Sequence, residues 1–260
     1  MALKLLKMNS PSLYKEGMEE FMPYRGTKSL VLERKGEKDG FGERFGREIP
    51  DGSLVFIEGK EGTGKSIFCQ RFCYGFLKQN YTCTYISTQY TIKSFLRQTS
   101  SVGYDARKYI MSGKLFFIST EVMLAEALPR KDYLNRLITS RRIFDPEIIF
   151  IDTLSTLLNE SLTRENLVEL TNFFNRLVGS GKIIFATANP DEWDEYLHRT
   201  LRRIADIHFK VTRESMPGIG IVHNIYIEKF NGARHRYEPV TTFSVQPGFG
   251  LTVETSGVAF

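Results

Sequence analysis

The stretch "GKEGTGKS", Gly59 to Ser66, decides the fold. It matches G-x-x-x-x-G-K-[ST], the pattern of a phosphate-binding loop, in which successive backbone N–H groups at a helix N-terminus point at an anion. The apolar run before it predicts a buried strand at Leu54–Glu58, and the apolar spacing after it predicts a helix at Ser66–Lys78. A strand, a glycine-rich loop and a helix are the context in which this motif binds a nucleotide.

We therefore expect this loop to bind ATP. Its glycines let the backbone approach the phosphates, and Lys65 is expected to reach the β- and γ-phosphates. The hydroxyl of Ser66 is expected to ligate Mg²⁺. The predicted ATP-binding residues are Gly59, Lys60, Glu61, Gly62, Thr63, Gly64, Lys65, Ser66 and Ile67.

Asp152 is the second predicted metal ligand, beside Ser66. It ends the apolar run "EIIFID" at 147–152, which predicts another buried strand. A carboxylate at the end of such a strand is costly unless it faces a cation or several hydrogen-bond donors. In proteins with this kind of loop, an aspartate at that place holds Mg²⁺ or its water. Capping of a following helix by Asp152 or Thr153 is the alternative interpretation.

The remaining pattern predicts one α/β domain. Further strands are expected at 82–87, 114–119 and 182–188, and helices at 92–99, 133–142 and 163–181, the last with Thr163 as its N-cap. This alternation predicts a mostly parallel central sheet with helices on both faces. From Asp206 onward, consecutive strands joined by Gly/Pro turns predict antiparallel hairpins that extend one edge of the sheet. We expect an N-terminal segment, 1–40, with a helix near Leu13–Phe21 and a strand near Ser29–Glu33, followed by the domain at 41–260.

Composition predicts a soluble, cytoplasmic protein. Of the 260 residues 42% are hydrophobic, and no apolar run approaches the ~20 residues of a membrane span or forms a signal peptide. The three cysteines, Cys69, Cys73 and Cys83, have no metal-site spacing and are expected to be buried, reduced thiols. The net charge of +5 arises from 35 basic and 30 acidic residues that are well mixed. It permits a nucleic-acid partner without requiring one.

Four longer stretches resemble the KaiC-type branch of the RecA superfamily. They are "FGREIPDGSLVFIEGKEGTGKS" (45–66), "IIFIDTLST" (148–156), "LRRIADIHFKV" (201–211) and "FSVQPGFGLTV" (243–253). Within that branch the chain is most similar to the single-domain ATP-binding subunits of the archaeal motility motor. The resemblance implies a RecA/KaiC-like P-loop NTPase fold and a homo-oligomeric ring, such as a hexamer, with ATP near subunit interfaces. The implied partners are the motor's assembly ATPase and its membrane platform, through which the protein would be peripheral to the membrane.

The sequence departs from this branch at the water-activating position. The resemblance implies adjacent glutamates where "YISTQYT" (85–91) has Thr88 and Gln89. Glutamine orients a water molecule but does not accept its proton, and the loss of a general base typically costs about 10²–10⁴-fold in rate. Slow or absent turnover is therefore expected, with Gln89 and Thr88 as candidates for positioning water. Glutamine does support hydrolysis in small GTPases, so turnover is not excluded.

A second departure concerns the residues expected to act in trans. The resemblance implies a Lys-x-Arg pair after a late strand that reaches the γ-phosphate of a neighbouring subunit. The matching segment "IEKFNGARHR" (227–236) keeps Lys229 but has Asn231 in place of the arginine, which leaves Arg234 and Arg236 as candidates. Thr187 and Asn189, at the end of "IIFATAN", are candidate γ-phosphate sensors, with a strand-end turn as the alternative.

Taken together, these patterns predict an ATP-binding regulatory or scaffolding subunit of a membrane-associated archaeal motor, with slow or no hydrolysis. A DNA-associated RecA-like ATPase is the alternative that the basic charge balance allows, although no helix-hairpin-helix module is present. An autophosphorylating clock-type kinase is a third interpretation. Arg202 and Arg203 are expected at a solvated helix end, with a role at a ring interface as the alternative. Trp193 is expected in packing, with recognition as the alternative. The four histidines show no ligand spacing: His198, His208, His223 and His235.

Overall fold

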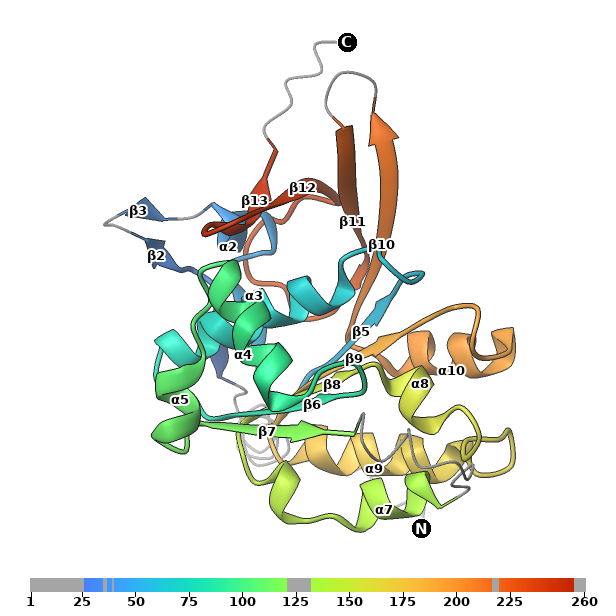
Figure 1. Ribbon diagram of the computed structural model, residues 1–260. Helices are drawn as coiled ribbons and strands as arrows, with labels where there is room; N and C mark the ends of the chain where they lie inside the picture. Colours follow the sequence, from blue (N-terminus) through green and yellow to red (C-terminus); the bar gives the residue numbers. More distant parts are fainter. Residues whose placement is uncertain (1–25, 35–36, 39, 121–131, 217–219, 255–260) are drawn as a thin grey trace, which may run out of the picture.

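A nine-stranded sheet forms the centre of the molecule (Figure 1). The computed structural model describes residues 26–34, 37–38, 40–120, 132–216 and 220–254. The strand order is β13-β12-β11-β10-β5-β9-β8-β6-β7. The bounds are β5 (Leu54–Glu58), β6 (Cys83–Ser87), β7 (Leu115–Ser119), β8 (Ile148–Asp152), β9 (Ile183–Ala188), β10 (Ile207–Met216), β11 (Gly220–Phe230), β12 (Val240–Gln246) and β13 (Gly250–Val253).

The sheet has a parallel part and an antiparallel part. Strands β5, β9, β8, β6 and β7 are parallel, and β10 also runs parallel to β5. From β10 to β13 each strand is antiparallel to the next, which confirms the predicted hairpins at one edge. Because the carboxyl ends of parallel strands meet at one edge of a sheet, the segments after β5, β6, β8 and β9 are brought together there.

Helices cover both faces of the sheet, as predicted (Figure 1). The first face carries α3 (Lys65–Lys78), α4 (Ile92–Ser101) and α5 (Arg107–Met111), and the second carries α7 (Tyr133–Thr139), α8 (Leu154–Leu158), α9 (Leu167–Gly179) and α10 (Glu195–Ile204). Alternation along β5 divides its side chains between the two cores, because successive side chains of a strand point to opposite faces. Val55 and Ile57 join the core under α3, and Leu54 and Phe56 join the core of the second face.

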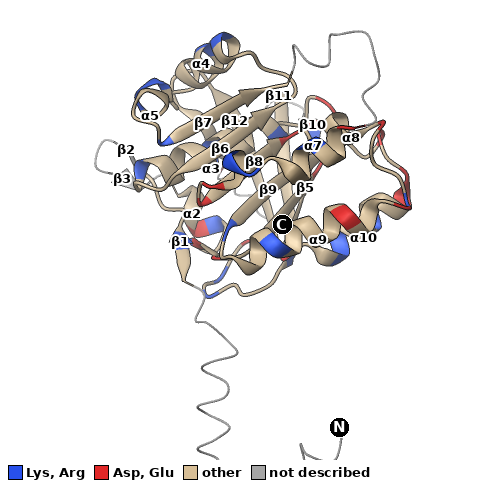
Figure 2. Cartoon of the chain, turned by 90° about the horizontal axis from the view of Figure 1, so that it is seen from below, with Lys and Arg blue, Asp and Glu red and all other residues tan. Residues whose placement is uncertain are grey.

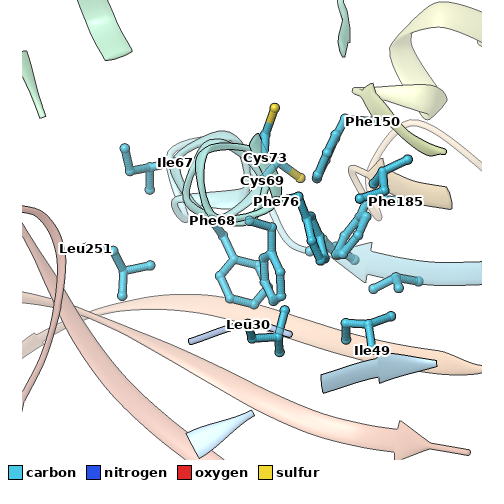
Figure 3. Packing of buried hydrophobic residues seen from close by; sticks show 14 of the residues in the cluster. Leu30, Ile49, Ile67, Phe68, Cys69, Cys73, Phe76, Phe150, Phe185 and Leu251 are labelled. Atoms are coloured by element: carbon cyan, nitrogen blue, oxygen red, sulfur yellow. The ribbon is translucent and has the colours of Figure 1, made fainter. Parts of the chain in front are cut away.

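Residues just before the predicted domain pack onto it. Strand β1 (Thr27–Ser29) pairs with β4 (Glu48–Pro50), and α2 (Phe41–Arg44) lies between them in sequence. Leu30 is 2% exposed, and Figure 3 shows it with Ile49 next to α3. The strand expected near Ser29–Glu33 is instead split into β1 and β2 (Glu33–Arg34), which pairs with β3 (Glu37–Lys38). The helix expected near Leu13–Phe21 lies outside the described residues.

Two predicted helix ends were wrong. The helix expected from Thr163 begins at Leu167, with Asn166 at the N-cap position. Thr163 and Asn166 bind each other in a preceding turn, where Thr163 N donates to Asn166 Oδ1 at 2.7 Å. The helix expected to reach Arg142 ends at Thr139, and Arg142–Phe144 forms a 3₁₀ turn.

The surface and the thiols agree with the composition. All three cysteines are buried and free. Figure 2 shows basic and acidic residues together on α9 and α10, whereas α4 and α5 carry basic ones. Within the described ranges, no helix has the length and apolar character needed to cross a membrane.

We predict that Leu30→Ala destabilises the protein by about 2–4 kcal/mol, because it removes a buried side chain from the core under α3. Val168→Ala is the matched control, since Val168 is 57% exposed and should cost less than about 0.5 kcal/mol. Urea unfolding of both variants measures the difference. Equal small losses would mean that residues 27–32 do not contribute to the core.

Candidate functional site

The loop 59–66 joins β5 to α3 at the carboxyl edge of the sheet, as predicted. Two glycines are required by its path. Gly64 has φ 98°, a left-handed conformation that side chains disfavour. A Cβ on Gly59 would lie 2.6 Å from the carbonyl oxygen of Val211 on β10, so the loop can pass this strand only as glycine.

Lys65 lies inside the loop. Its Nζ donates to the carbonyl oxygens of Gly59 at 2.5 Å and Lys60 at 2.8 Å. Burial lowers the pKa of Lys65, and the negative charge of Asp152 acts in the opposite direction. The ammonium group is therefore held among the loop's own backbone atoms, at the place where the motif predicts phosphates.

Asp152 is fully buried at the end of β8 and is surrounded by hydroxyl donors. Oδ1 accepts from Ser66 Oγ at 3.0 Å and from Thr187 Oγ1 at 3.3 Å, and Oδ2 accepts from the Tyr85 hydroxyl at 2.9 Å. Burial raises the pKa of Asp152, while these hydrogen bonds and the charge of Lys65 oppose the rise. Its side chain faces Ser66 and makes no cap to α8, whose N-cap position is Thr153.

Ser66 and Asp152 form an oxygen donor set that fits Mg²⁺. Magnesium prefers oxygen ligands and is usually bound by one or two protein groups together with phosphates and waters. Elsewhere in the described residues, no group of three or more His, Cys, Asp or Glu side chains could hold a metal ion.

The segment after β6 braces the end of β8. Thr88 is buried, its N–H donates to the carbonyl oxygen of Asp152 at 2.8 Å, and its hydroxyl accepts from Thr153 N at 3.2 Å. Gln89 is exposed, and its backbone N–H donates to Ser87 Oγ at 3.2 Å. Thr88 thus fixes backbone beside Asp152, whereas the Gln89 side chain lies at the surface of the carboxyl edge.

The two candidate sensors at the end of β9 differ in their contacts. Thr187 is buried and bonded to Asp152, as described above. Asn189 closes a turn: its Oδ1 accepts from Asp191 N at 3.2 Å, and its own N–H donates to Ser155 Oγ at 2.8 Å. The turn interpretation therefore accounts for the observed contacts of the Asn189 side chain.

The residues expected to act in trans do not meet the loop of their own subunit. Lys229 Nζ donates to the carbonyl oxygens of Arg203 and Ala205, at 3.1 and 2.5 Å. Phe230 pairs with Ile207, which pairs with Val55 near the start of β5, so the chain beyond β11 leaves at the edge opposite the loop. Arg234 and Arg236 follow there and are exposed. Within this fold, they could reach only the nucleotide of another molecule.

The sequence analysis missed a buried charge cluster directly before the loop. Glu58, the last residue of β5, lies with Oε1 2.7 Å from His198 Nδ1 and with Oε2 2.6 Å from His208 Nε2. Arg202 donates to both oxygens, at 2.5 and 2.9 Å, so it is not the solvated helix end that was expected. Burial alone would raise the pKa of Glu58, but the bonds from His198, His208 and Arg202 hold it well below its usual range.

This cluster borders a cavity, which Glu58, Arg202 and His208 help to line. The cavity has a volume of about 770 Å³ and lies between the outer side of the loop and the strands β10 and β11. One feature of the sequence could have indicated the charge cluster: Glu58 ends an apolar strand with a carboxylate, as Asp152 does. Its partners come from α10 and β10, at least 140 residues further along the chain, and only the fold reveals them.

Comparisons with known proteins agree with the geometry. The family model described as "ATPase: KaiC" matches residues 37–255. The archaeal flagellar ATP-binding protein FlaH of Methanocaldococcus jannaschii is 34% identical over 85% of this chain and 95% of that protein. FlaH of Methanococcus voltae is also 34% identical, over 86% of this chain and 96% of that protein.

Solved structures show the same similarity. The crystal structure of the flagellar accessory protein FlaH from Methanocaldococcus jannaschii superposes with a TM-score of 0.82 and 31% identity, covering 88% of this chain and all of that one. A KaiC-like protein from Pyrococcus horikoshii OT3 superposes with a TM-score of 0.63 at 22% identity, over 86% of this chain and 99% of that one, and shows the shared fold.

We predict that Tyr85→Phe weakens the site without changing its shape. The substitution removes the donor to Asp152 Oδ2, so the pKa of Asp152 rises further and the buried carboxylate loses about 1.5–3 kcal/mol of hydrogen bonding. The midpoint of thermal unfolding should fall, and ATP binding should require a higher Mg²⁺ concentration. Tyr226→Phe, on the half-buried β11 position, is the control. Identical behaviour of the two variants would contradict the role assigned to Tyr85.

We predict that Glu58→Gln destabilises the protein by about 3 kcal/mol at pH 7, because it leaves three basic side chains without their carboxylate. The folded pKa of Glu58 is below its ordinary value of 4.5. Its stabilising contribution is therefore present above that value and lost as pH falls through the folded pKa. The stability gap between wild type and variant should persist from about pH 8 to 5 and close only in stronger acid. A gap that vanishes by pH 6 would show that Glu58 is not the group responsible.

Proposed function

The chain belongs to the KaiC family of ATPases and, within it, to the group of archaeal flagellar FlaH proteins, and from that premise we propose that it is an ATP-binding regulatory or scaffolding subunit of a membrane-associated archaeal motility motor. One observation carries the proposal. The loop 59–66, Lys65 and the Ser66–Asp152 pair supply the groups that would bind phosphates and Mg²⁺, yet the segment Ser87–Thr91 beside them holds no acid.

The chain's own groups divide the work of holding Mg·ATP. The N–H groups of the loop and the ammonium group of Lys65 would bind the phosphates, and Ser66 and Asp152 would hold Mg²⁺. Tyr85 and Thr187 keep the Asp152 carboxylate in place. When bound, Mg²⁺ offsets negative charge on the phosphates and on Asp152, whose pKa is raised by burial.

Slow or absent hydrolysis is the expectation for the segment Ser87–Thr91, which holds no acid at the position where relatives are expected to carry glutamates. Thr88 is used in bracing the backbone of β8, and Gln89 has no proton-accepting group. The missing base costs about 10²–10⁴-fold in rate. Lys229, Arg234 and Arg236 lie toward the other edge of the sheet, so any help from them requires a second subunit.

Nucleotide binding would then act by changing assembly. A ligand shifts a population only by its different affinity for the two states. We infer that ATP favours one oligomeric or partner-bound state, with a ring of identical subunits as the assembly. The motor's assembly ATPase and membrane platform would be the partners, placing the protein at the cytoplasmic membrane through them. This inference is supported by membership of the FlaH group.

We predict that Mg·ATP changes the assembly state of the wild-type protein and that Mg·ADP does so to a smaller extent. Sedimentation velocity without nucleotide, with ADP and with ATP measures self-association, and a titration with the motor's assembly ATPase measures partner affinity. Lys65→Ala is the control, because it removes the ammonium group that binds phosphate. Unchanged self-association together with unchanged partner affinity in all three conditions would contradict a regulatory role.

A further inference from the structure

A second carboxylate lies beside the nucleotide site. Glu192 follows β9 in the loop that leads to α10 and is half-buried. It accepts from Ser155 Oγ at 2.5 Å and from Thr156 Oγ1 at 2.9 Å. Ser155 is fully buried, so two hydroxyl groups hold this carboxylate in a defined place.

The contacts of Glu192 place it at the same edge of the sheet as Asp152. Ser155 and Thr156 belong to the first turn of α8, which begins two residues after Asp152. The Ser155 hydroxyl also accepts from Asn189 N at 2.8 Å, so the start and the end of the segment Asn189–Glu192 are attached to one side chain. The segment is thereby held against the start of α8.

The same segment contacts the phosphate-binding loop. Asp191, next to Glu192, forms an ion pair with Lys60 at 3.2 Å. The end of β9 just before this segment also contacts the loop, because Gly59 N donates to the carbonyl oxygen of Ala188 at 3.2 Å. The segment that carries Glu192 therefore lies against the loop that holds Lys65. Burial lowers the pKa of Lys65, and the negative charges of Asp152 and Glu192 oppose this shift.

We propose that Glu192 is a specificity-determining residue of this site, whose carboxylate faces the γ-phosphate end of the bound nucleotide and makes binding sensitive to the third phosphate. The inference rests on the proposed binding of ATP at residues 59–66. Like charges near a protein surface repel appreciably over several ångströms. ATP must work against this repulsion, whereas ADP, which is one phosphate shorter, does so much less.

The position of Glu192 also connects the nucleotide site to α10. The loop that carries it leads into α10, and Arg202 of α10 binds Glu58, the residue directly before Gly59. A displacement of Glu192 from Ser155 and Thr156 would therefore pull on a helix that is itself attached to the other end of the phosphate-binding loop. The presence of the third phosphate would thereby change the position of α10.

The test compares affinities for Mg·ATP and Mg·ADP, measured by calorimetry on wild type and Glu192→Gln. We expect the variant to bind ATP about three- to tenfold more tightly than wild type, because one negative charge is removed, and to bind ADP within about twofold of wild type. Glu160→Gln is the matched control: it removes one acidic charge from an exposed position just beyond α8 and should change neither affinity.

Thr156→Val separates charge from structural support. It removes a hydroxyl group that holds Glu192 but keeps the carboxylate, so the preference for ATP over ADP should not increase. If Glu192 only anchors its loop, Thr156→Val and Glu192→Gln should change both affinities in parallel, and that result would overturn the inference. An unchanged ATP-to-ADP ratio in Glu192→Gln would overturn it as well.

Failure of the proposed function would look different. If the wild type binds neither nucleotide, or if Lys65→Ala binds them as well as the wild type does, residues 59–66 are not the nucleotide site. Both the proposed function and this inference would then be wrong. Thermal unfolding of each variant establishes that affinities are compared between folded proteins.

Discussion

The buried carboxylate of Asp152 is the constraint on which the site depends. It lies among hydroxyl groups from three other elements: Ser66 on α3, Tyr85 on β6 and Thr187 on β9. Each donor reaches it only because β6, β8 and β9 are in register and α3 starts directly at the loop. A shift of one residue in β6 or β9 would turn its donor to the opposite face and leave the buried carboxylate with one hydrogen-bond partner fewer. The register of the sheet thus fixes the position of Asp152, the candidate metal ligand.

Two buried carboxylates lie on either side of the loop 59–66, and their surroundings make them chemically different. Glu58 is surrounded by two histidines and an arginine, which hold its pKa low and complete its charge balance within the protein. Asp152 accepts hydrogen bonds from neutral hydroxyl groups, and the charge of Lys65 also acts on it. Burial raises the pKa of Asp152. A divalent cation therefore gains more by binding at Asp152 than at Glu58. Glu58 thus anchors the residue that precedes the loop, whereas Asp152, beside the end of the loop, is the carboxylate that could bind a metal ion.

Local patterns in the sequence were enough to predict the loop, the strand that ends at Asp152 and the succession of strands and helices along the chain. Each of these depends on residues that are neighbours in the sequence. The family model and the relatives confirmed the fold and the group to which the chain belongs. Contacts between distant residues could not be predicted in this way. Tyr85 lies in an otherwise apolar strand, so its hydrogen bond to Asp152 could not be predicted. The partners of Glu58 lie at least 140 residues away on α10 and β10. Thr163 was misplaced as a cap because Asn166, three residues later, occupies that position.

The central proposal is that the site holds ATP but turns it over slowly. The most direct measurement is the affinity for Mg·ATP and the rate of phosphate release on the same sample, with Lys65→Ala as the blank. We predict tight binding by the wild type, abolished in the variant, with phosphate release close to that of the blank. Rapid release well above the blank would contradict it, since a water molecule would then be activated efficiently without an acid in the segment Ser87–Thr91.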